Sequence, residues 1–138
     1  MSWLMFALLS AVAAAFTAIL AKVGVEGVPS TSATAIRSVV VAVLVWVIVF
    51  AAGEQRVLGQ VSRRSLIFLV LSGVATAVSL LAYFRALQMA PATWVAPIDK
   101  LSLPLTVVLA VLLLGEPFTW PVTIGVTLMV AGAIVTRL

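Results

Sequence analysis

The chain contains no cysteine and no histidine among its 138 residues. The lack of cysteine excludes disulfide bonds, thiol chemistry and thiolate metal sites. The lack of histidine removes the commonest metal ligand and the usual proton shuttle near neutral pH. The sequence also lacks a glycine-rich phosphate loop and any nucleophile–base–acid set. We therefore expect no enzymatic activity, no metal and no cofactor.

Charged residues are also scarce, at 9% of the chain, whereas soluble proteins carry roughly 25%. Hydrophobic residues make up 64%, and the mean hydropathy is +1.33. A soluble domain of this length could not bury so much apolar surface, so we expect a protein embedded in a lipid bilayer. The net charge is +4, with basic residues near the ends of apolar stretches. This pattern favours contact with lipid headgroups over nucleic acid.

Five apolar stretches are each about long enough for a membrane span, which needs about 20 residues. They cover about residues 3–22, 32–52, 66–87, 92–114 and 119–137. The connectors are too short for a soluble domain. The sequence therefore predicts an all-α membrane protein, with one domain over residues 1–138 and five transmembrane helices. Ser30 and Ser32 are candidate N-caps, and Pro97 and Pro104 predict a kinked or partly unwound fourth helix.

Charged side chains within or at the ends of these stretches are the sharpest functional signal. Arg37 lies early in the second stretch, and Asp99 and Lys100 lie roughly 10 Å into the fourth. Lys22 and Arg85 close the first and third stretches. An embedded charge costs on the order of 2.5–3.5 kcal/mol unless it is paired or hydrated. Four bases and one acid predict a hydrated cavity for anionic or zwitterionic groups, although Lys22, Arg85 and Arg37 could instead snorkel to headgroups.

Asp99 and Lys100 are neighbours, so in a continuous helix their side chains point about 100° apart. We expect them not to pair, which leaves Lys100 to bind another group or a substrate. Asp99 shares a helical face with Ser102 and Thr106. Because its side chain is too short to reach headgroups, we expect a functional or ion-paired role. The segment 97–100 is predicted to form a flexible gate.

Hydroxyl side chains form a stripe along the third stretch. Ser72, Thr76, Ser79 and Tyr83 recur at spacings of four, three and four. Lipid tails cannot satisfy hydroxyl groups, so we expect the stripe to face protein or water. Trp94, near the start of the fourth stretch, belongs either to an interfacial aromatic belt or to the mouth of a substrate cavity.

Two glycines, Gly125 and Gly132, stand seven residues apart in the fifth stretch. They form a flat strip on which another helix can dock, either within the chain or across a dimer. Five spans would place the termini on opposite sides of the membrane. Basic residues are then distributed almost evenly, with Arg56, Arg63 and Arg64 on the N-terminal side and Lys22, Arg85 and Arg137 on the other. This balance selects no single orientation.

Several motifs together resemble the EamA repeat of the drug/metabolite transporter superfamily. They are YFRAL at 83–87, PAT at 91–93, APIDKLS at 96–102, Pro104, GE at 115–116, the pattern around Gly125 and Gly132, and Arg37. The resemblance covers essentially the whole chain. It implies half of a ten-helix drug/metabolite transporter fold, because most members carry two inverted five-helix repeats around a central cavity. Two copies of this chain would then pair as a homodimer, in a parallel or an antiparallel arrangement.

The related small multidrug exporters pair in this way through a glycine-lined last helix. They also carry an essential glutamate in their first helix, eight residues before a lysine that Lys22 resembles. In this chain that position is Ala14. Asp99 is therefore the embedded acid that could replace the glutamate.

We expect a homodimeric transporter in the bacterial inner membrane that exports small metabolites by alternating access. The substrates would be amino-acid-like or other anionic or zwitterionic compounds. The candidate substrate contacts are Arg37, Ser79, Tyr83, Trp94, Asp99 and Lys100, with Gly125 and Gly132 at the dimer interface. Two alternatives are a non-transporting assembly partner of another membrane protein and a subunit of a lipid-linked sugar flippase.

Overall fold

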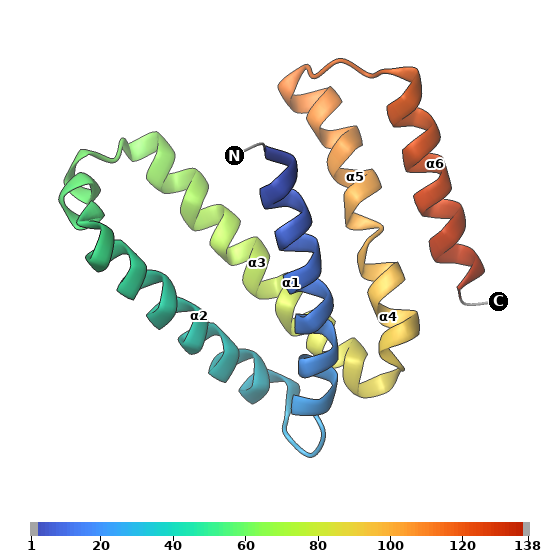
Figure 1. Cartoon of the computed structure of the whole chain (residues 1–138), viewed down its shortest axis with the longest axis horizontal. Helices are drawn as coiled ribbons and strands as arrows, with labels where there is room; N and C mark the ends of the chain where they lie inside the picture. The colour runs from blue at the N-terminus through green and yellow to red at the C-terminus, as the bar shows by residue number, and fades with distance from the viewer. Residues whose placement is uncertain (1–2, 137–138) are drawn as a thin grey trace. The chain divides into compact units, whose positions relative to one another are not determined.

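The computed structural model describes residues 3–136. Arg137, which the sequence analysis placed on the side of the membrane opposite the N-terminus, lies outside the described residues. The described residues form helices joined by short connectors, with no strand among them, which confirms the all-α prediction (Figure 1). The helices are α1 (Trp3–Gly24), α2 (Ser30–Ala52), the 3-10 helix η1 (Glu54–Gln60), α3 (Arg63–Met89), α4 (Ala92–Asp99), α5 (Ser102–Leu109), the π-helix η2 (Ala110–Leu114) and α6 (Trp120–Val135).

The chain divides into two compact units, one of them continuous from Ala21 to Gln88. This continuous unit contains the end of α1 together with α2 and α3. Its buried apolar side chains come from the last turn of α1, the following loop and the last turns of α3, namely Ala21, Val25, Phe84 and Leu87. Burial in this unit is therefore concentrated where α1 ends and α3 ends.

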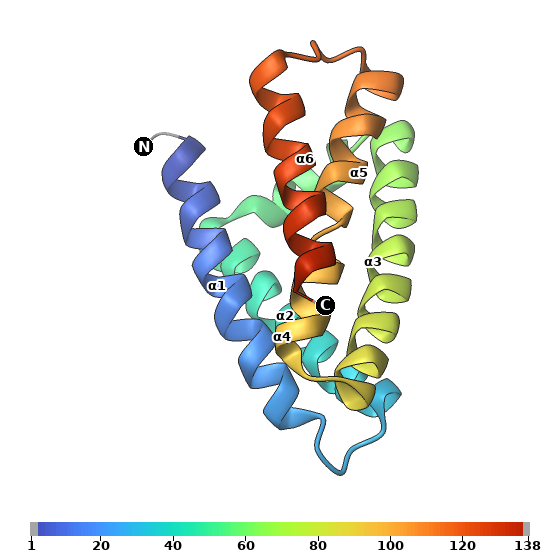
Figure 2. The ribbon, with the colours of Figure 1, turned by 90° about the vertical axis from the view of Figure 1, so that its right-hand side faces the viewer.

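The other unit joins residues 1–20 to residues 89–138. Within it, α6 packs against both α4 and α5 (Figure 2). Its buried residues are Val95, Pro104 and Ala133, one from each of these helices. A small alanine on α6 suits close helix packing, because the backbones can approach one another.

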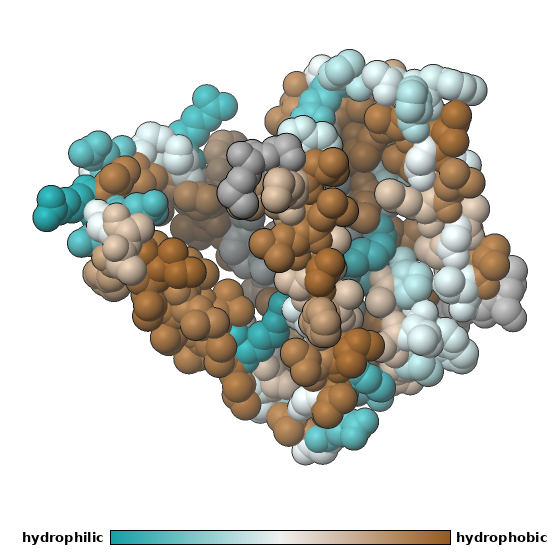
Figure 3. Space-filling view, in the orientation of Figure 1, coloured by the Kyte–Doolittle hydropathy of each residue, from teal (hydrophilic) through white to brown (hydrophobic). Residues whose placement is uncertain are grey.

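Most of the large apolar side chains lie on the surface, which is largely hydrophobic in the space-filling view (Figure 3). Such a surface needs lipid or another protein to cover it. Four segments are long and apolar enough to cross a membrane: Trp3–Gly24, Ser30–Ala52, Arg63–Met89 and Ala92–Leu114. Helix α6 has only 16 residues, roughly 24 Å at 1.5 Å per residue. Four of the five predicted spans thus have the required length, and the fifth is shorter.

The start of α2 differs from the sequence prediction. The carbonyl of Pro29 already accepts the N–H of Ala33 at 3.0 Å, so the helical bonding begins before either predicted cap. Ser30 is consequently the first helical residue, and its carbonyl accepts the hydroxyl of Thr34 at 2.8 Å. The assignment of Ser30 and Ser32 as N-caps was wrong, because no side chain caps this helix.

The start of α3 has a side-chain cap that the sequence analysis did not identify. The Ser62 hydroxyl accepts the backbone N–H of Ser65 at 3.1 Å, which satisfies one of the free N–H groups of the first turn. Helix α3 therefore begins at Arg63, a few residues before the predicted position.

The predicted kink in the fourth stretch is confirmed as a break between α4 and α5. Pro104 has no N–H to donate to the carbonyl of Lys100, which instead accepts the N–H of Leu103 at 3.0 Å. The N–H of Leu101 likewise bonds to the carbonyl of Ile98, three residues earlier, at 3.0 Å. The backbone is therefore tightened between Asp99 and Ser102, and this places the two charged residues at an irregular point of a span-length segment.

Candidate functional site

In the continuous unit, the Lys22 side chain makes a hydrogen bond to a backbone carbonyl of α3. The Lys22 ammonium donates to the carbonyl of Leu87, in the last turns of α3, at 2.5 Å. Helix C-termini carry exposed carbonyls and partial negative charge, so a cation is stabilised there. Leu87 itself is completely buried. Lys22 thus fastens the end of α1 to the end of α3.

Gln88 makes a second contact of this kind. Its side-chain amide donates to the carbonyl of Val28, in the loop between α1 and α2, at 2.6 Å. Its carbonyl oxygen accepts from the guanidinium of Arg85 at 3.3 Å. Gln88 therefore ties the α1–α2 loop to α3, a role that the sequence analysis missed because the two segments are far apart in the sequence.

We expect Gln88→Leu to lower the free energy of unfolding by about 1 kcal/mol, because it leaves the Val28 carbonyl without this donor. Unfolding by sodium dodecyl sulfate in mixed micelles measures this change. Gln60→Leu is the matched control, since Gln60 is exposed at the end of η1. Equal stability of the two variants would refute the role given to Gln88.

Arg37 and Tyr83 meet at the ring of Phe84. The Arg37 guanidinium lies 5.8 Å from the ring centroid, within the range of a cation–π contact. Tyr83 contacts the same ring edge-on, with centroids 6.3 Å apart. Phe84 is only 3% exposed, so it is a fixed platform for the half-buried arginine. The sequence analysis did not select Phe84, although it lies inside the YFRAL motif.

The hydroxyl stripe on α3 is exposed at Ser72, Thr76 and Ser79. The Thr76 hydroxyl donates to the carbonyl of Ser72 at 2.9 Å. Thr106 in α5 does the same with the carbonyl of Ser102, at 2.8 Å. Threonines bonded back to their own helix need no outside partner, so they are compatible with an apolar surrounding. Ser79 is an exposed residue of this stripe and lies four residues before Tyr83 in the sequence. It is the member of the stripe that we keep as a candidate substrate contact.

Asp99 and Lys100 form an ion pair, with 3.3 Å between Nζ and Oδ2. The expectation that they would not pair was wrong. It assumed a continuous helix, whereas α4 ends at Asp99 and Lys100 adopts φ −71° and ψ −6°. Their side chains are 33% and 56% exposed, respectively. The pair is therefore accessible from outside the unit while each charge compensates the other.

The predicted contacts fall into two groups, one in each unit. Arg37, Ser79 and Tyr83 belong to the continuous unit, and Arg37 and Tyr83 share Phe84. Trp94, Asp99 and Lys100 belong to the other unit. Trp94 is 48% exposed on α4, one to two turns before the ion pair. Each group combines a cationic side chain with an aromatic residue in the same unit.

The two glycines of α6, Gly125 and Gly132, have open space at the position of a Cβ atom. A Cβ atom built at Gly125 or Gly132 would meet nothing within 4 Å among residues 3–136, the helix backbone aside. The packing of α6 against α4 and α5 buries Ala133 instead. The two glycines, seven residues apart, therefore leave a strip free on α6.

The EamA-like transporter family matches over residues 1–138. An uncharacterized transporter in the cobO 3′ region of a Sinorhizobium species is 46% identical over 133 residues, which cover 96% of this chain and 94% of that protein. No solved structure shows a significant match. With its long apolar helices and exposed apolar surface, the chain belongs to the EamA-like transporter family of multi-pass membrane transporters.

Proposed function

We propose that this chain is one subunit of a homodimeric transporter that exports small anionic or zwitterionic metabolites, such as amino-acid-like compounds. Transport would proceed by alternating access in the bacterial inner membrane. The observation that carries this proposal is the Asp99–Lys100 ion pair, at a helix break inside the span-length segment Ala92–Leu114.

The chemistry of the ion pair suits a charged substrate. Charges within a membrane span are unfavourable and usually mark a transport pathway. Because both side chains are accessible, a substrate carboxylate can replace Asp99 as the partner of Lys100. A substrate ammonium can bind Asp99 at the same time. Trp94, exposed on the same helix, offers a surface for the substrate's apolar part.

The group in the continuous unit also contains a cation, Arg37. Arg37 contacts a neutral ring, so its guanidinium retains donors for a substrate carboxylate or phosphate. Phe84 holds that guanidinium in place, and Tyr83 and Ser79 supply hydroxyl groups from α3. Taken by itself, this group in the continuous unit can bind an anionic group of a metabolite.

Two observations support a homodimer that rebuilds a ten-helix fold. The strip of Gly125 and Gly132 is free for a second α6. The match to this chain also covers 94% of the Sinorhizobium relative, so that protein has about the length of one five-helix repeat. In this arrangement α6 serves as the fifth span. The bilayer would thin locally around its 16 residues, or flanking residues would snorkel, at a modest free-energy cost.

A ligand screen on the purified protein tests this proposal. We expect amino acids or other small zwitterions and anions to raise the melting temperature of the dimer in detergent. The Lys100→Ala variant should lose that shift for the same compounds. Stable co-purification with a second polypeptide, and no response to any metabolite, would instead favour an assembly partner.

An antiparallel dimer requires that single chains insert in both orientations, which the even distribution of basic residues permits. We therefore expect a C-terminal tag to be accessible from both sides of the membrane in the unmodified protein. Additional lysines at one terminus should fix one orientation and abolish transport until an oppositely biased copy is co-expressed. Accessibility from one side only would contradict the antiparallel arrangement.

A further inference from the structure

The connector between α2 and α3 concentrates positive charge. Residues 54–64, here named the arginine connector, comprise η1, the two residues after it and the first two residues of α3. They contain Arg56, Arg63 and Arg64 and one acid, Glu54. All four charged side chains are exposed. Within residues 3–136, Asp99–Lys100 is the ion pair that forms, so Glu54 makes no ion pair with any of these arginines. The guanidinium groups are therefore available to an outside anion.

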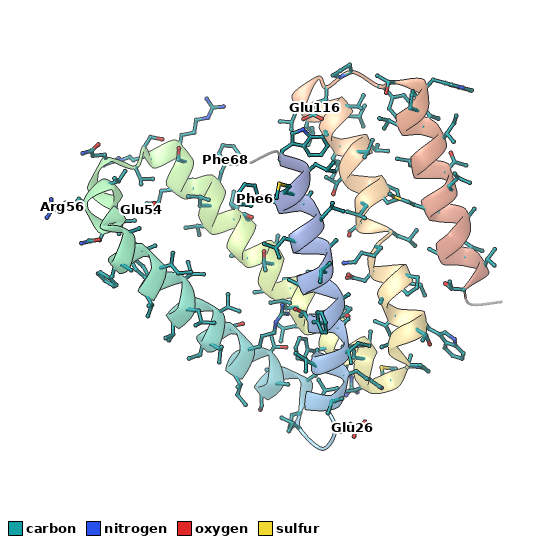
Figure 4. The ribbon with its side chains drawn as sticks, viewed as in Figure 1. Phe6, Glu26, Glu54, Arg56, Phe68 and Glu116 are labelled. Carbon is teal, nitrogen blue, oxygen red and sulfur yellow. The ribbon has the colours of Figure 1, made fainter. Side chains whose placement is uncertain are left out.

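The other connectors have the opposite charge or none. The α1–α2 loop carries Glu26, the connector before α6 carries Glu116, and neither has a basic residue (Figure 4). The α3–α4 connector, Ala90 and Pro91, is uncharged. Anions are therefore attracted to the arginine connector rather than to the connectors in general.

The arginine connector also presents apolar side chains. Val57 and Leu58 on η1 are 57% and 50% exposed. Near the end of α2, Trp46 and Phe50 form an exposed aromatic pair with centroids 5.7 Å apart. Aromatic and aliphatic groups beside basic side chains are typical of segments that lie at the membrane–water interface.

We propose that the arginine connector binds the headgroups of anionic phospholipids, with Val57 and Leu58 against the acyl chains. The connector joins two span-length helices and is short, so its charges stay close to the membrane surface. Figure 3 shows hydrophilic groups gathered at this connector, next to the hydrophobic surface of α2. The partner of complementary charge at that depth is the anionic headgroup. This inference does not depend on the substrate or on transport.

The test counts phospholipid molecules bound to the purified protein by native mass spectrometry, with phosphatidylglycerol and phosphatidylcholine as probes. We expect the protein to bind more phosphatidylglycerol than phosphatidylcholine. Each Arg→Gln change should weaken that binding roughly five-fold. The triple variant Arg56→Gln, Arg63→Gln, Arg64→Gln should therefore bind phosphatidylglycerol about a hundred-fold more weakly than the wild type.

Matched variants separate the charge of the connector from its fold. The triple Arg→Lys variant keeps the charge and should retain phosphatidylglycerol. Glu54→Gln should bind it more tightly, and Arg85→Gln, which changes an exposed arginine of α3 outside the connector, should bind it as the wild type does. If the triple glutamine variant misfolds, the single Arg56→Gln variant at unchanged melting temperature still tests the expected five-fold loss.

Three results would overturn the proposal. They are equal binding of the two phospholipids, unchanged phosphatidylglycerol binding in the glutamine variants, and binding of inorganic phosphate at the arginines without binding of phosphatidylglycerol. The last result would show that the arginines take a free anion rather than a lipid.

Discussion

Asp99→Asn is expected to reduce substrate transport by roughly ten-fold to a hundred-fold, while the protein stays folded and keeps the dimer that we propose. The change removes the negative charge that pairs with Lys100 at 3.3 Å and that we assign to the substrate's cationic group. Loss of one charge-assisted contact costs roughly 1.5–3 kcal/mol, which corresponds to this change in rate. Lys100 is 56% exposed, so its long side chain can reach a hydrated surface when its partner is neutral.

Glu116→Gln is the matched control for Asp99→Asn. It also neutralises one acid, but in the exposed connector before α6, and should leave transport unchanged. The double variant Asp99→Asn, Lys100→Gln removes both charges together. If the pair serves only to neutralise itself in the membrane, this double variant should transport as the wild type does. We expect it to be at least as defective as Asp99→Asn.

Gly132→Leu is expected to weaken dimerisation roughly five-fold to a hundred-fold, and Gly125→Leu should have a similar effect. In a single chain either side chain enters open space, since no atom among the described residues outside the helix backbone lies within 4 Å of the added Cβ. Between two closely packed copies of α6 the same side chain overpacks the interface, at a cost of about 1–3 kcal/mol. The dimer fraction can be measured by light scattering during size-exclusion chromatography in detergent.

Gly73→Leu provides the control for this experiment. Gly73 lies in α3, and a Cβ there likewise meets nothing within 4 Å among residues 3–136. The substitution should leave the dimer intact, because we place only α6 at the interface. If Gly73→Leu dissociates the dimer and Gly132→Leu does not, the interface lies on α3 instead.

The sequence predicted the helices and the break in the fourth stretch because those features depend on local properties. The length of each apolar stretch defines a span. The missing N–H of Pro104 changes the backbone hydrogen bonding locally, whatever the tertiary packing around it. The same break then invalidated the expectation for Asp99 and Lys100. Their separation was deduced from regular helical geometry, which ends at Asp99.

Contacts between distant segments could not be predicted in the same way. The bond from Lys22 to the carbonyl of Leu87 joins positions 65 residues apart, and no local pattern marks a backbone carbonyl as a partner. Phe84 lies inside the YFRAL motif that carries the family resemblance, but the motif gives it no role of its own. Its position beneath Arg37 became evident only from the packing of α2 and α3.

Counterflow in liposomes that contain this purified chain as the only protein tests the central claim most directly. Liposomes loaded with an unlabelled metabolite that stabilises the dimer should accumulate the labelled compound from outside. Asp99→Asn liposomes should accumulate roughly ten-fold to a hundred-fold less, and Glu116→Gln liposomes should match the wild type. Accumulation by wild-type liposomes that is no greater than in protein-free liposomes, for every metabolite that binds, would contradict the claim that the chain is by itself a homodimeric transporter.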